Sequence, residues 1–270
     1  MTTILATSTT VTTGYVGWLG LVASLSLVGI AVAISAWQHL DLERSLIWAS
    51  ARAIVQLLAV GAVLAVVFSP RVPLAASWAW VLFMVVFAAD TIRRRAPEVP
   101  GARRLALASL GLATVVCLGV LFGLRIFPLN ARTLIPLAGM VVGNSLTATV
   151  VAARRVVAEF TDKRAEVEAR LALGISSRDS ARPYVRDALR TAMISQIEST
   201  KAVGLVFLPG AMTGLILAGE KPLQAVLVQA AVMFLILGAV ATTAAAMSLG
   251  LSRRLFTADH RLVRLARPVG

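Results

Sequence analysis

Seven stretches of mainly apolar residues run through this chain of 270 residues and leave it few possible folds. At a rise of about 1.5 Å per residue, a helix needs about 20 apolar residues to cross the hydrocarbon core of a bilayer. Six stretches are of helix length and the third is shorter; they cover residues 15–36, 46–68, 74–89, 105–124, 134–151, 192–218 and 223–251. The predicted fold class is all-α: a polytopic transmembrane helix bundle of about seven spans, forming a single transmembrane domain over residues 1–270.

The composition indicates that lipid, rather than water, surrounds most of this surface. The chain is 58% hydrophobic and 14% charged, whereas soluble domains average roughly 45–50% and about 25%. A soluble protein with this balance could not cover its surface with polar side chains, and a bilayer removes that requirement. We therefore expect a multi-pass protein of the cell (inner or plasma) membrane, with membrane lipid as a partner.

The net charge of +13 is concentrated beside alternate apolar stretches. Lys and Arg gather in residues 91–104, 154–190 and 253–267, each after an odd-numbered stretch. The opposite loops hold only Arg71, Arg125, Arg132 and Lys221. Cytoplasmic loops of membrane proteins carry such an excess, which predicts an outside N-terminus and a cytoplasmic C-terminus. Basic clusters next to apolar spans indicate a membrane surface, so no nucleic-acid partner is expected.

Residue types that bind metals or phosphates are scarce. Cys117 is the only cysteine, and His39 and His260 are the only histidines, so neither a disulfide within the chain nor a Cys/His zinc site is expected. None of the three lysines follows a glycine, as the loop that cradles ATP phosphates requires. We therefore expect a transport subunit without a cofactor of its own, not an enzyme. Its energy would come from a separate subunit or from an ion gradient.

Residues 154–190, between the fifth and sixth stretches, form the only long polar part of the chain. Apolar residues at helical spacing predict a first helix, and Gly174 is suited to end it. Ser176 or Ser177 is placed to cap a second helix. Together these signals predict a compact cytoplasmic hairpin.

The end of the first helix in this hairpin carries a short motif. Glu168, Ala169 and Gly174 resemble the Glu-Ala-Ala-x3-Gly motif with which ABC permeases dock a coupling helix onto their ATP-binding subunit. Arg170 stands where the motif has its second alanine. Arg182 and Arg186 follow in the second helix and are assigned to the same ATPase-coupling surface. The alternative is a solvated hairpin with no partner.

Three further motifs resemble the FetB family of iron-export ABC permeases, also described as an uncharacterised membrane-protein family. They are Arg52-Ala53-Ile54-Val55-Gln56-Leu57, Pro136-Leu137-Ala138-Gly139-Met140-x2-Gly143-Asn144, and a series from Arg186 through Val203-Gly204-Leu205-Val206, Leu208-Pro209-Gly210 and Met212-x-Gly214 to Gln229. The resemblance implies a homodimeric permease paired with ATP-binding cassette subunits that hold ATP and Mg²⁺. The implied cargo is iron or another metal, exported from the cell. Plant relatives of the family are linked to aluminium tolerance and to UDP-glucose export, so ABC export of a UDP-sugar is an alternative.

Polar and thioether side chains inside the spans are candidates for a transport pathway, because such groups are costly in lipid unless they face a cavity or another helix. The candidates are Gln56, Met140, Asn144, Thr147, Glu198, Lys201 and Met212. The fifth-span members share one helix face, for which close helix packing is the alternative. Interhelical hydrogen bonding is the alternative for Gln56, and an ion pair at the membrane interface for Glu198 with Lys201. No set of metal ligands can be assigned.

Glycine and proline mark expected packing and bending positions in the fifth and sixth spans. Gly139 and Gly143 form a small-xxx-small pattern that permits close helix contact. Pro209 precedes Gly210-x3-Gly214 and is expected to kink the sixth span, either as a hinge or as a static bend. Two other functions are also compatible with the sequence: a gradient-driven transporter or channel, and a membrane scaffold without transport.

Overall fold

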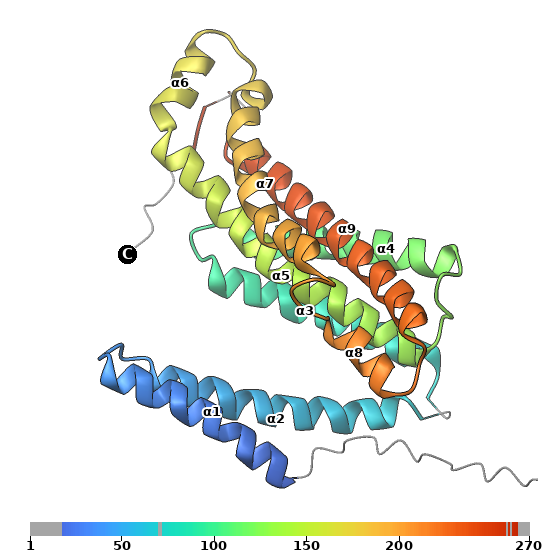
Figure 1. Ribbon diagram of the computed structural model, residues 1–270. Helices are drawn as coiled ribbons and strands as arrows, with labels where there is room; N and C mark the ends of the chain where they lie inside the picture. The colour runs from blue at the N-terminus through green and yellow to red at the C-terminus, as the bar shows by residue number, and fades with distance from the viewer. Residues whose placement is uncertain (1–17, 70–71, 258, 260, 264–270) are drawn as a thin grey trace, which may run out of the picture. The chain divides into compact units, whose positions relative to one another are not determined.

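The computed structural model describes residues 18–69, 72–257, 259 and 261–263 (Figure 1). The elements named within these residues are all helices: α1 (Trp18–Trp37), α2 (Glu43–Val67), α3 (Leu74–Arg95), α4 (Ala102–Gly123), α5 (Ala131–Asp162), α6 (Arg164–Ala172), α7 (Ser177–Ala202), α8 (Gly210–Leu217) and α9 (Pro222–Arg254). Six of them, α1 to α5 and α9, are long and apolar enough to cross a membrane. This confirms the predicted all-α polytopic architecture. The predicted start of the first span, at residues 15–17, lies outside the described residues.

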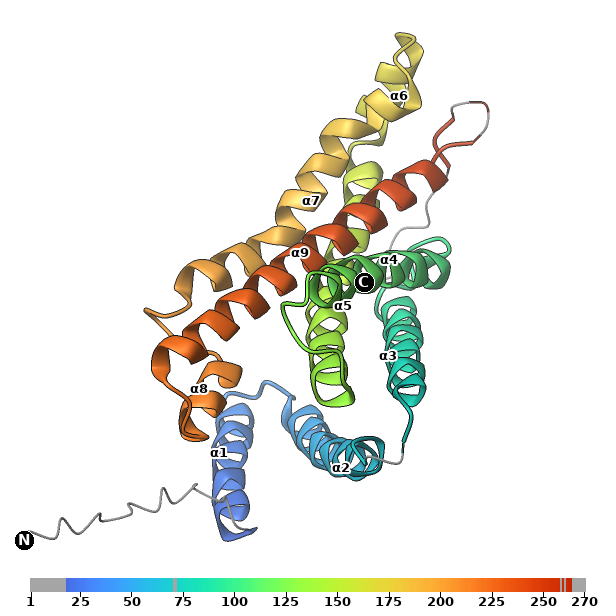
Figure 2. The same cartoon turned by 90° about the vertical axis from the view of Figure 1, so that its right-hand side faces the viewer.

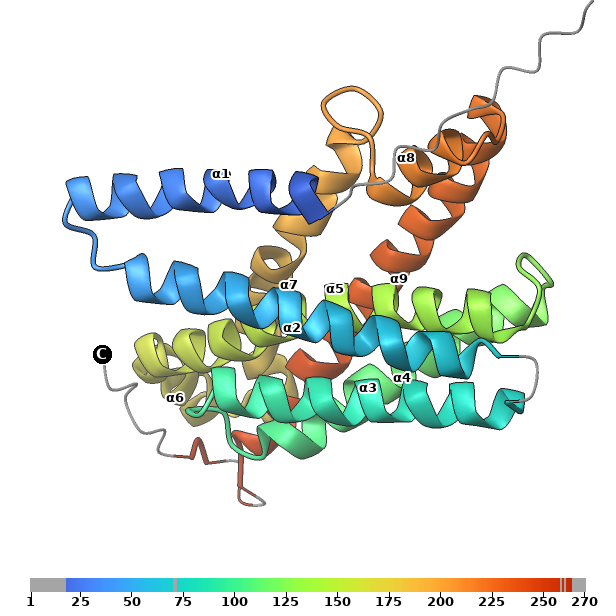
Figure 3. The ribbon, with the colours of Figure 1, turned by 90° about the horizontal axis from the view of Figure 1, so that it is seen from below.

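The chain divides into two compact units, Met1–Val72 with Gly214–Lys221 and Pro73–Thr213 with Pro222–Gly270. In the first unit α1 and α2 form an antiparallel pair (Figure 3). Ser35 closes the loop between them, because its hydroxyl donates to Oε1 of Glu43 at 2.6 Å and accepts from the N–H of Leu42 at 3.2 Å. Among its described residues α2 buries none. That the two units form a single transmembrane domain stays a prediction.

The second unit is a helix bundle in which α5 is central. α5 packs against α3, α4, α7 and α9, and α5, α7 and α9 run side by side towards the α6 end (Figures 1 and 2). A capping box fixes its first turn: the Asn130 side chain accepts from the N–H of Thr133 at 3.0 Å, and Thr133 Oγ1 accepts from the N–H of Asn130 at 3.4 Å. α5 then continues for 32 residues. One unbroken helix therefore connects the two ends of the bundle.

Two sets of polar contacts bring distant segments to one end of this bundle. Nε of Arg154 lies 2.8 Å from Oε1 of Glu98, which joins α5 to the connection between α3 and α4. The guanidinium of Arg164 donates to the backbone carbonyls of Leu262 and Val263 at 3.1 and 3.2 Å. The α3–α4 connection, the polar hairpin and the segment after α9 thus share one side, as the alternation of basic loops predicted.

The third span was expected to be short, at residues 74–89, but it is the first part of the longer helix α3. Asp90 does not end the helix, because its carboxylate lies 3.1 Å from Nε of Arg93 and 2.8 Å from Nε of Arg94. Pairs three and four residues apart support a helix. The helix therefore passes from its apolar part into the basic loop without a break.

The sixth span predicted at residues 192–218 is not one continuous helix. α7 ends at Ala202 and α8 begins at Gly210. Gly204 has φ +86°, a left-handed conformation that ends helices. Pro209 directly precedes Gly210, where α8 begins, and a missing N–H costs no hydrogen bond at the start of a helix. The kink expected at Pro209 is therefore a full break, with an unwound segment at residues 203–209.

This broken segment still carries the chain across the bundle. α5 and α9 both end at the hairpin side, where the rings of Phe160 and Phe256 have centroids 5.8 Å apart. α9 is long enough to cross a membrane, so it begins on the other side, and the chain that follows α7 leads there. The sixth crossing is therefore discontinuous. Transporters use discontinuous helices to place backbone polar groups at membrane depth.

Candidate functional site

The polar hairpin is formed by the end of α5, by α6 and by the start of α7. α6 ends in a Schellman motif, in which the N–H of Ile175 donates to the carbonyl of Arg170 at 3.2 Å and the N–H of Gly174 donates to that of Leu171 at 3.0 Å. Gly174 has φ +80°, so it is the residue after the helix end that usually adopts the left-handed conformation. The predicted helix end at Gly174 is confirmed.

The turn between α6 and α7 presents an apolar tip at the outer end of the hairpin (Figure 1). Leu173 is 80% exposed, and Ala169 is exposed beside it. α7 starts directly after this turn and is capped by Ser176, whose Oγ accepts from the N–H of Asp179 at 3.1 Å. Single exposed leucines are common on protein surfaces. This one is fixed between a helix end and a helix cap, at a point that a partner can reach.

Aromatic rings pack the base of the hairpin around Phe160, which is fully buried. Its ring meets those of Tyr184 and Phe256 edge to face, with centroids 5.8 Å apart in each pair. Val167 of α6 and Leu255 after α9 are fully buried in the same core. Such aromatic pairs add about 0.5–1.5 kcal/mol each beyond the burial of apolar area. α5, α6, α7 and the segment after α9 are thereby held together.

Paired charges surround this base. Glu159 is 4% exposed and lies 2.6 Å from Nη2 of Arg155 and 2.8 Å from Nζ of Lys163. The hydrogen bond to Glu159 raises the pKa of Lys163, and its Nζ also lies 5.5 Å from the centre of the Tyr184 ring. Burial, together with the Glu166 carboxylate 3.2 Å from its hydroxyl, raises the pKa of Tyr184. Near neutral pH Lys163 is therefore charged and Tyr184 is neutral.

A row of arginines follows one exposed face of α7. The four side chains recur every fourth residue: Arg178, Arg182, Arg186 and Arg190. Residues four apart lie one turn apart on the same helix face, so they form a positively charged stripe that begins beside the tip. Among the described residues none of the four has an ion-pair partner. Such a stripe is complementary to an acidic partner surface.

Gly174→Ala is expected to lower the free energy of unfolding by about 1 kcal/mol. The cost is conformational, because φ is +80° and an added Cβ would meet no atom within 4 Å. Gly174→Asn is the matched control, since asparagine adopts the left-handed conformation more readily than alanine. Chemical denaturation in detergent measures both variants. A wild-type midpoint for Gly174→Ala would show that this turn is not held in the left-handed conformation.

The predicted pathway stripe of α5 lies on an open face of the second unit. Asn144 and Thr147 are exposed, and Met140 is partly buried. Nδ2 of Asn144 donates to the carbonyl of Met140 at 2.8 Å. That bond engages the amide nitrogen and not the amide oxygen. The stripe therefore presents oxygen and sulfur atoms on a face that this unit does not bury.

The glycines assigned to helix packing differ in their surroundings. A Cβ at Gly139 would lie 3.2 Å from Cε of Met84, so α5 approaches α3 closely there. At Gly143, Gly210 and Gly214 no described atom lies within 4 Å of an added Cβ. Close contact is thus observed for Gly139, and the packing role of the other three stays a prediction.

The remaining pathway candidates lie in three places. Glu198 and Lys201 pair as predicted, with Oε1 and Nζ 2.9 Å apart, and both side chains are more than half exposed in the last turns of α7, just before the unwound segment. Met212 is partly buried in α8. Gln56 is exposed on α2, in the first unit. Their roles in transport stay predictions.

The residues that pack the base of the hairpin could not be identified from the sequence. Phe160, Tyr184 and Phe256 come from three segments that are far apart in the chain. The available signal was local: Arg155 and Lys163 stand four residues on either side of Glu159, a spacing that pairs charges on a helix. Buried Gln229 of α9 was also missed as a site. No described atom hydrogen-bonds to its Oε1.

These observations define the class of protein: a polytopic membrane protein with one discontinuous crossing and a well-packed polar hairpin that extends beyond its spans. The chain belongs to the Uncharacterised protein family (UPF0014), whose model matches residues 18–256. The matched range includes every helix from α1 to α9. No solved structure matches the chain.

Relatives from plants and bacteria extend over most of the chain. UPF0014 membrane protein STAR2 of Oryza sativa subsp. japonica is 41% identical, over 83% of this chain and 78% of its own length. UPF0014 membrane protein YjkA of Bacillus subtilis (strain 168) is 35% identical, over 91% and 98%. The probable iron export permease protein FetB of Escherichia coli (strain K12) is 30% identical, over 90% and 93%. The similarity thus covers nearly the whole length of both bacterial relatives.

Proposed function

We propose that this chain is the membrane-spanning subunit of an ABC transporter that exports iron or another metal, with ATP hydrolysed on a separate subunit. The observation that carries the proposal is the hairpin tip, where Leu173 is exposed between a Schellman motif and a helix cap. The relative from Escherichia coli described as a probable iron export permease supports the transport activity and the cargo.

The tip and the arginine row form two parts of one docking surface. Leu173 would enter an apolar cleft of the ATP-binding subunit, and the stripe from Arg178 to Arg190 would face acidic side chains around that cleft. Glu168 is held in place on α6, because its Oε1 lies 2.7 Å from Nε of Arg164. Arg164 also binds the carbonyls after α9. A force on α6 would therefore reach both α5 and α9.

Movement of the tip would be transmitted through α5 and absorbed in the unwound segment. α5 is one helix from the hairpin base to the opposite end of the bundle, so it would move as a lever. α7 is joined to the hairpin base but ends at Ala202. Residues 203–209 are not helical, so relative movement there breaks no regular helix. We infer that ATP-driven displacement of the hairpin changes access at this segment.

The cargo would pass along the polar stripe of α5. Asn144 and Thr147 supply oxygen atoms and Met140 supplies a thioether, and a metal ion can use ligands of both kinds. Glu198 adds a carboxylate next to the unwound segment, where Lys201 balances its charge. Backbone carbonyls at the break of a discontinuous helix also coordinate cations in transporters. A set of weak ligands along a path allows an ion to enter and to leave.

Gly174→Arg is expected to lower co-purification with a candidate ATP-binding subunit, and the ATPase rate of the complex, by roughly tenfold. The added side chain occupies the space beside Leu173 that the partner would need. Gly174→Ala is the control, because it introduces the same backbone strain without the bulk. If Gly174→Arg assembles and hydrolyses ATP like the control, the docking assignment is wrong.

Metal content separates the proposed cargo from the other functions. A deletion strain should accumulate iron or another metal, measured across several metals, and the wild-type gene should reverse this. Unchanged metal content with altered UDP-sugar export would keep the ABC class and replace the cargo.

Transport by the purified chain alone in proteoliposomes, abolished by Glu198→Gln, would establish a gradient-driven transporter instead. Tolerance of alanine at Asn144, Glu198 and Lys201 without any loss would favour a scaffold.

A further inference from the structure

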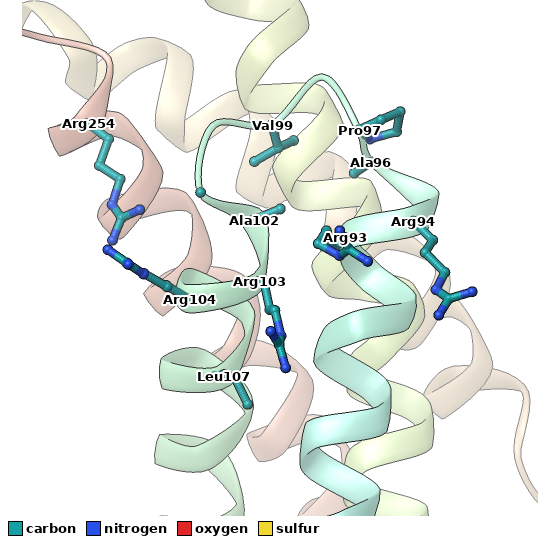
Figure 4. Close-up of a pocket in the computed structure, with 11 residues that line it drawn as sticks. Arg93, Arg94, Ala96, Pro97, Val99, Ala102, Arg103, Arg104, Leu107 and Arg254 are labelled. Carbon is teal, nitrogen blue, oxygen red and sulfur yellow. The ribbon is translucent and has the colours of Figure 1, made fainter.

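A basic pocket opens at the hairpin end of the second unit, formed by α3, the α3–α4 connection, α4 and the end of α9 (Figure 4). Its volume is about 670 Å³. Five of the residues that line it are arginines, which are Arg93, Arg94, Arg103, Arg104 and Arg254. Neither the coupling tip nor the pathway stripe contributes to its lining.

The positive charge of this pocket is not balanced within the described part of the chain. Arg93 and Arg94 share the single carboxylate of Asp90. Among the described residues, Arg103, Arg104 and Arg254 have no ion-pair partner. Like charges held close together repel each other. An anion in the pocket would remove this repulsion.

The guanidinium of Arg254 lies at the beginning of α4. It occupies the space next to Gly101, so a Cβ at that position would collide with Nη1 of Arg254. Figure 4 shows the side chains of Arg254 and Arg104 pointing toward one another. The guanidinium groups of Arg254, on α9, and Arg104, on α4, therefore lie close together, and no described carboxylate forms an ion pair with either of them.

The start of α4 adds a second attraction for an anion. Its N-cap residue Gly101 has no side chain to cap the helix, and its first turn contains no acidic residue. The first N–H groups of a helix carry a partial positive charge and bind phosphate readily. An acidic residue would offset that charge, whereas this first turn contains Arg103 and Arg104. The helix end and the arginines therefore favour the same kind of ligand, a phosphate group.

The floor and the edge of the pocket are apolar. Ala96, Val99 and Ala102 are buried beneath the arginines. Leu107 lies at the edge, and Val115 follows two turns later on the same face of α4, where it is 72% exposed. An apolar track that leads from a phosphate-binding group along a membrane helix suits an acyl chain.

We propose that this pocket binds the phosphate headgroup of an anionic membrane phospholipid, with an acyl chain along α4. The ligand chemistry is a phosphate ester, held by Arg103, Arg104 and Arg254 and by the start of α4. Basic pockets between membrane helices on the cytoplasmic side bind anionic headgroups in this way. Such a lipid would join the end of α9 to the start of α4.

The test uses the full-length chain in detergent, mixed with phosphatidylglycerol or phosphatidylcholine and measured by native mass spectrometry. Arg104→Gln with Arg254→Gln should lower retention of phosphatidylglycerol relative to phosphatidylcholine by roughly tenfold. Arg95→Gln with Arg253→Gln is the matched control. It removes the same charge from exposed positions that do not line the pocket, so its retention should fall less than about twofold.

Equal losses in the two double variants would overturn the proposal, since the attraction would then be a general surface effect. A competition with inorganic phosphate distinguishes the source of the phosphate. Retained phosphatidylglycerol in millimolar phosphate supports the lipid. Displacement by phosphate from the wild type would assign the pocket to a soluble phosphate and overturn the lipid assignment. Thermal unfolding of both double variants should match the wild type, because all four side chains are exposed.

Discussion

Leu173→Asp is expected to abolish most of the ATPase activity that depends on this chain. Leu173 is 80% exposed at the tip, so the substitution does not disturb the fold of the free chain. Burial of a leucine in a partner's cleft contributes roughly 1.5–3 kcal/mol, and an unpaired buried carboxylate adds a further cost. Affinity for the ATP-binding subunit should therefore fall by at least about thirtyfold, which corresponds to about 2 kcal/mol.

The measurement is ATPase rate against the concentration of the ATP-binding subunit, with the transporter in proteoliposomes. Ala165→Asp is the matched control, because Ala165 is exposed at the start of the same helix, where an acidic residue suits the helix dipole. The control should keep most of the affinity. Equal losses for the two variants would show that the added charge, and not the tip, determines the result.

Phe160→Ala is expected to destabilise the hairpin base by about 3–5 kcal/mol. The ring projects from α5 and is fully buried against α7 and the segment after α9. Its removal leaves a cavity that surrounding side chains from three segments cannot all close. Denaturant unfolding in detergent, followed by circular dichroism, should show a lower midpoint. Coupled ATPase activity should fall with it, since a loose base no longer transmits movement of the tip.

Phe234→Ala provides the comparison for this variant. Phe234 lies on α9 of the same unit and is 69% exposed, so the loss of its ring should cost under about 1 kcal/mol. Phe160→Leu should fall between the two, because it retains most of the apolar volume. Equal midpoints for Phe160→Ala and Phe234→Ala would mean that the aromatic base does not stabilise the hairpin.

The membrane helices and the hairpin turn could be predicted because their signals are local. Apolar length defines a span within about 20 residues. The C-terminal end of α6 and the N-terminal end of α7 are signalled by Gly174 and Ser176. Pairing of Glu198 with Lys201 also follows from their spacing on one helix. Each of these features needs only neighbours along the chain.

The break in the sixth crossing could not be predicted from apolar length. Residues 203–208 are all apolar apart from Gly204, so hydrophobicity continues across the gap between α7 and α8. The left-handed Gly204 follows the end of α7 and Pro209 precedes the start of α8, and neither residue interrupts the apolar run. Apolar length shows where lipid surrounds the chain but not where a helix stops.

The hairpin base and the basic pocket depend on contacts between distant segments. Phe160 meets Phe256 across nearly a hundred residues, and Arg254 lies beside Gly101. Neither pairing leaves a periodic signal in the sequence. For the same reason the arginines of the pocket first appear as ordinary members of basic cytoplasmic loops.

Photo-crosslinking in cells tests the central claim, that the hairpin is cytosolic and is held by an ATP-hydrolysing partner. In one variant a benzophenone amino acid would replace Leu173. In a second variant it would replace Ile126, which lies in the α4–α5 connection at the other end of the bundle. We expect a crosslink from position 173 to a protein with a Gly-Lys-Ser/Thr phosphate-binding loop, and none to that protein from position 126. A crosslink to that protein from position 126, or only to extracytoplasmic proteins from position 173, would contradict it.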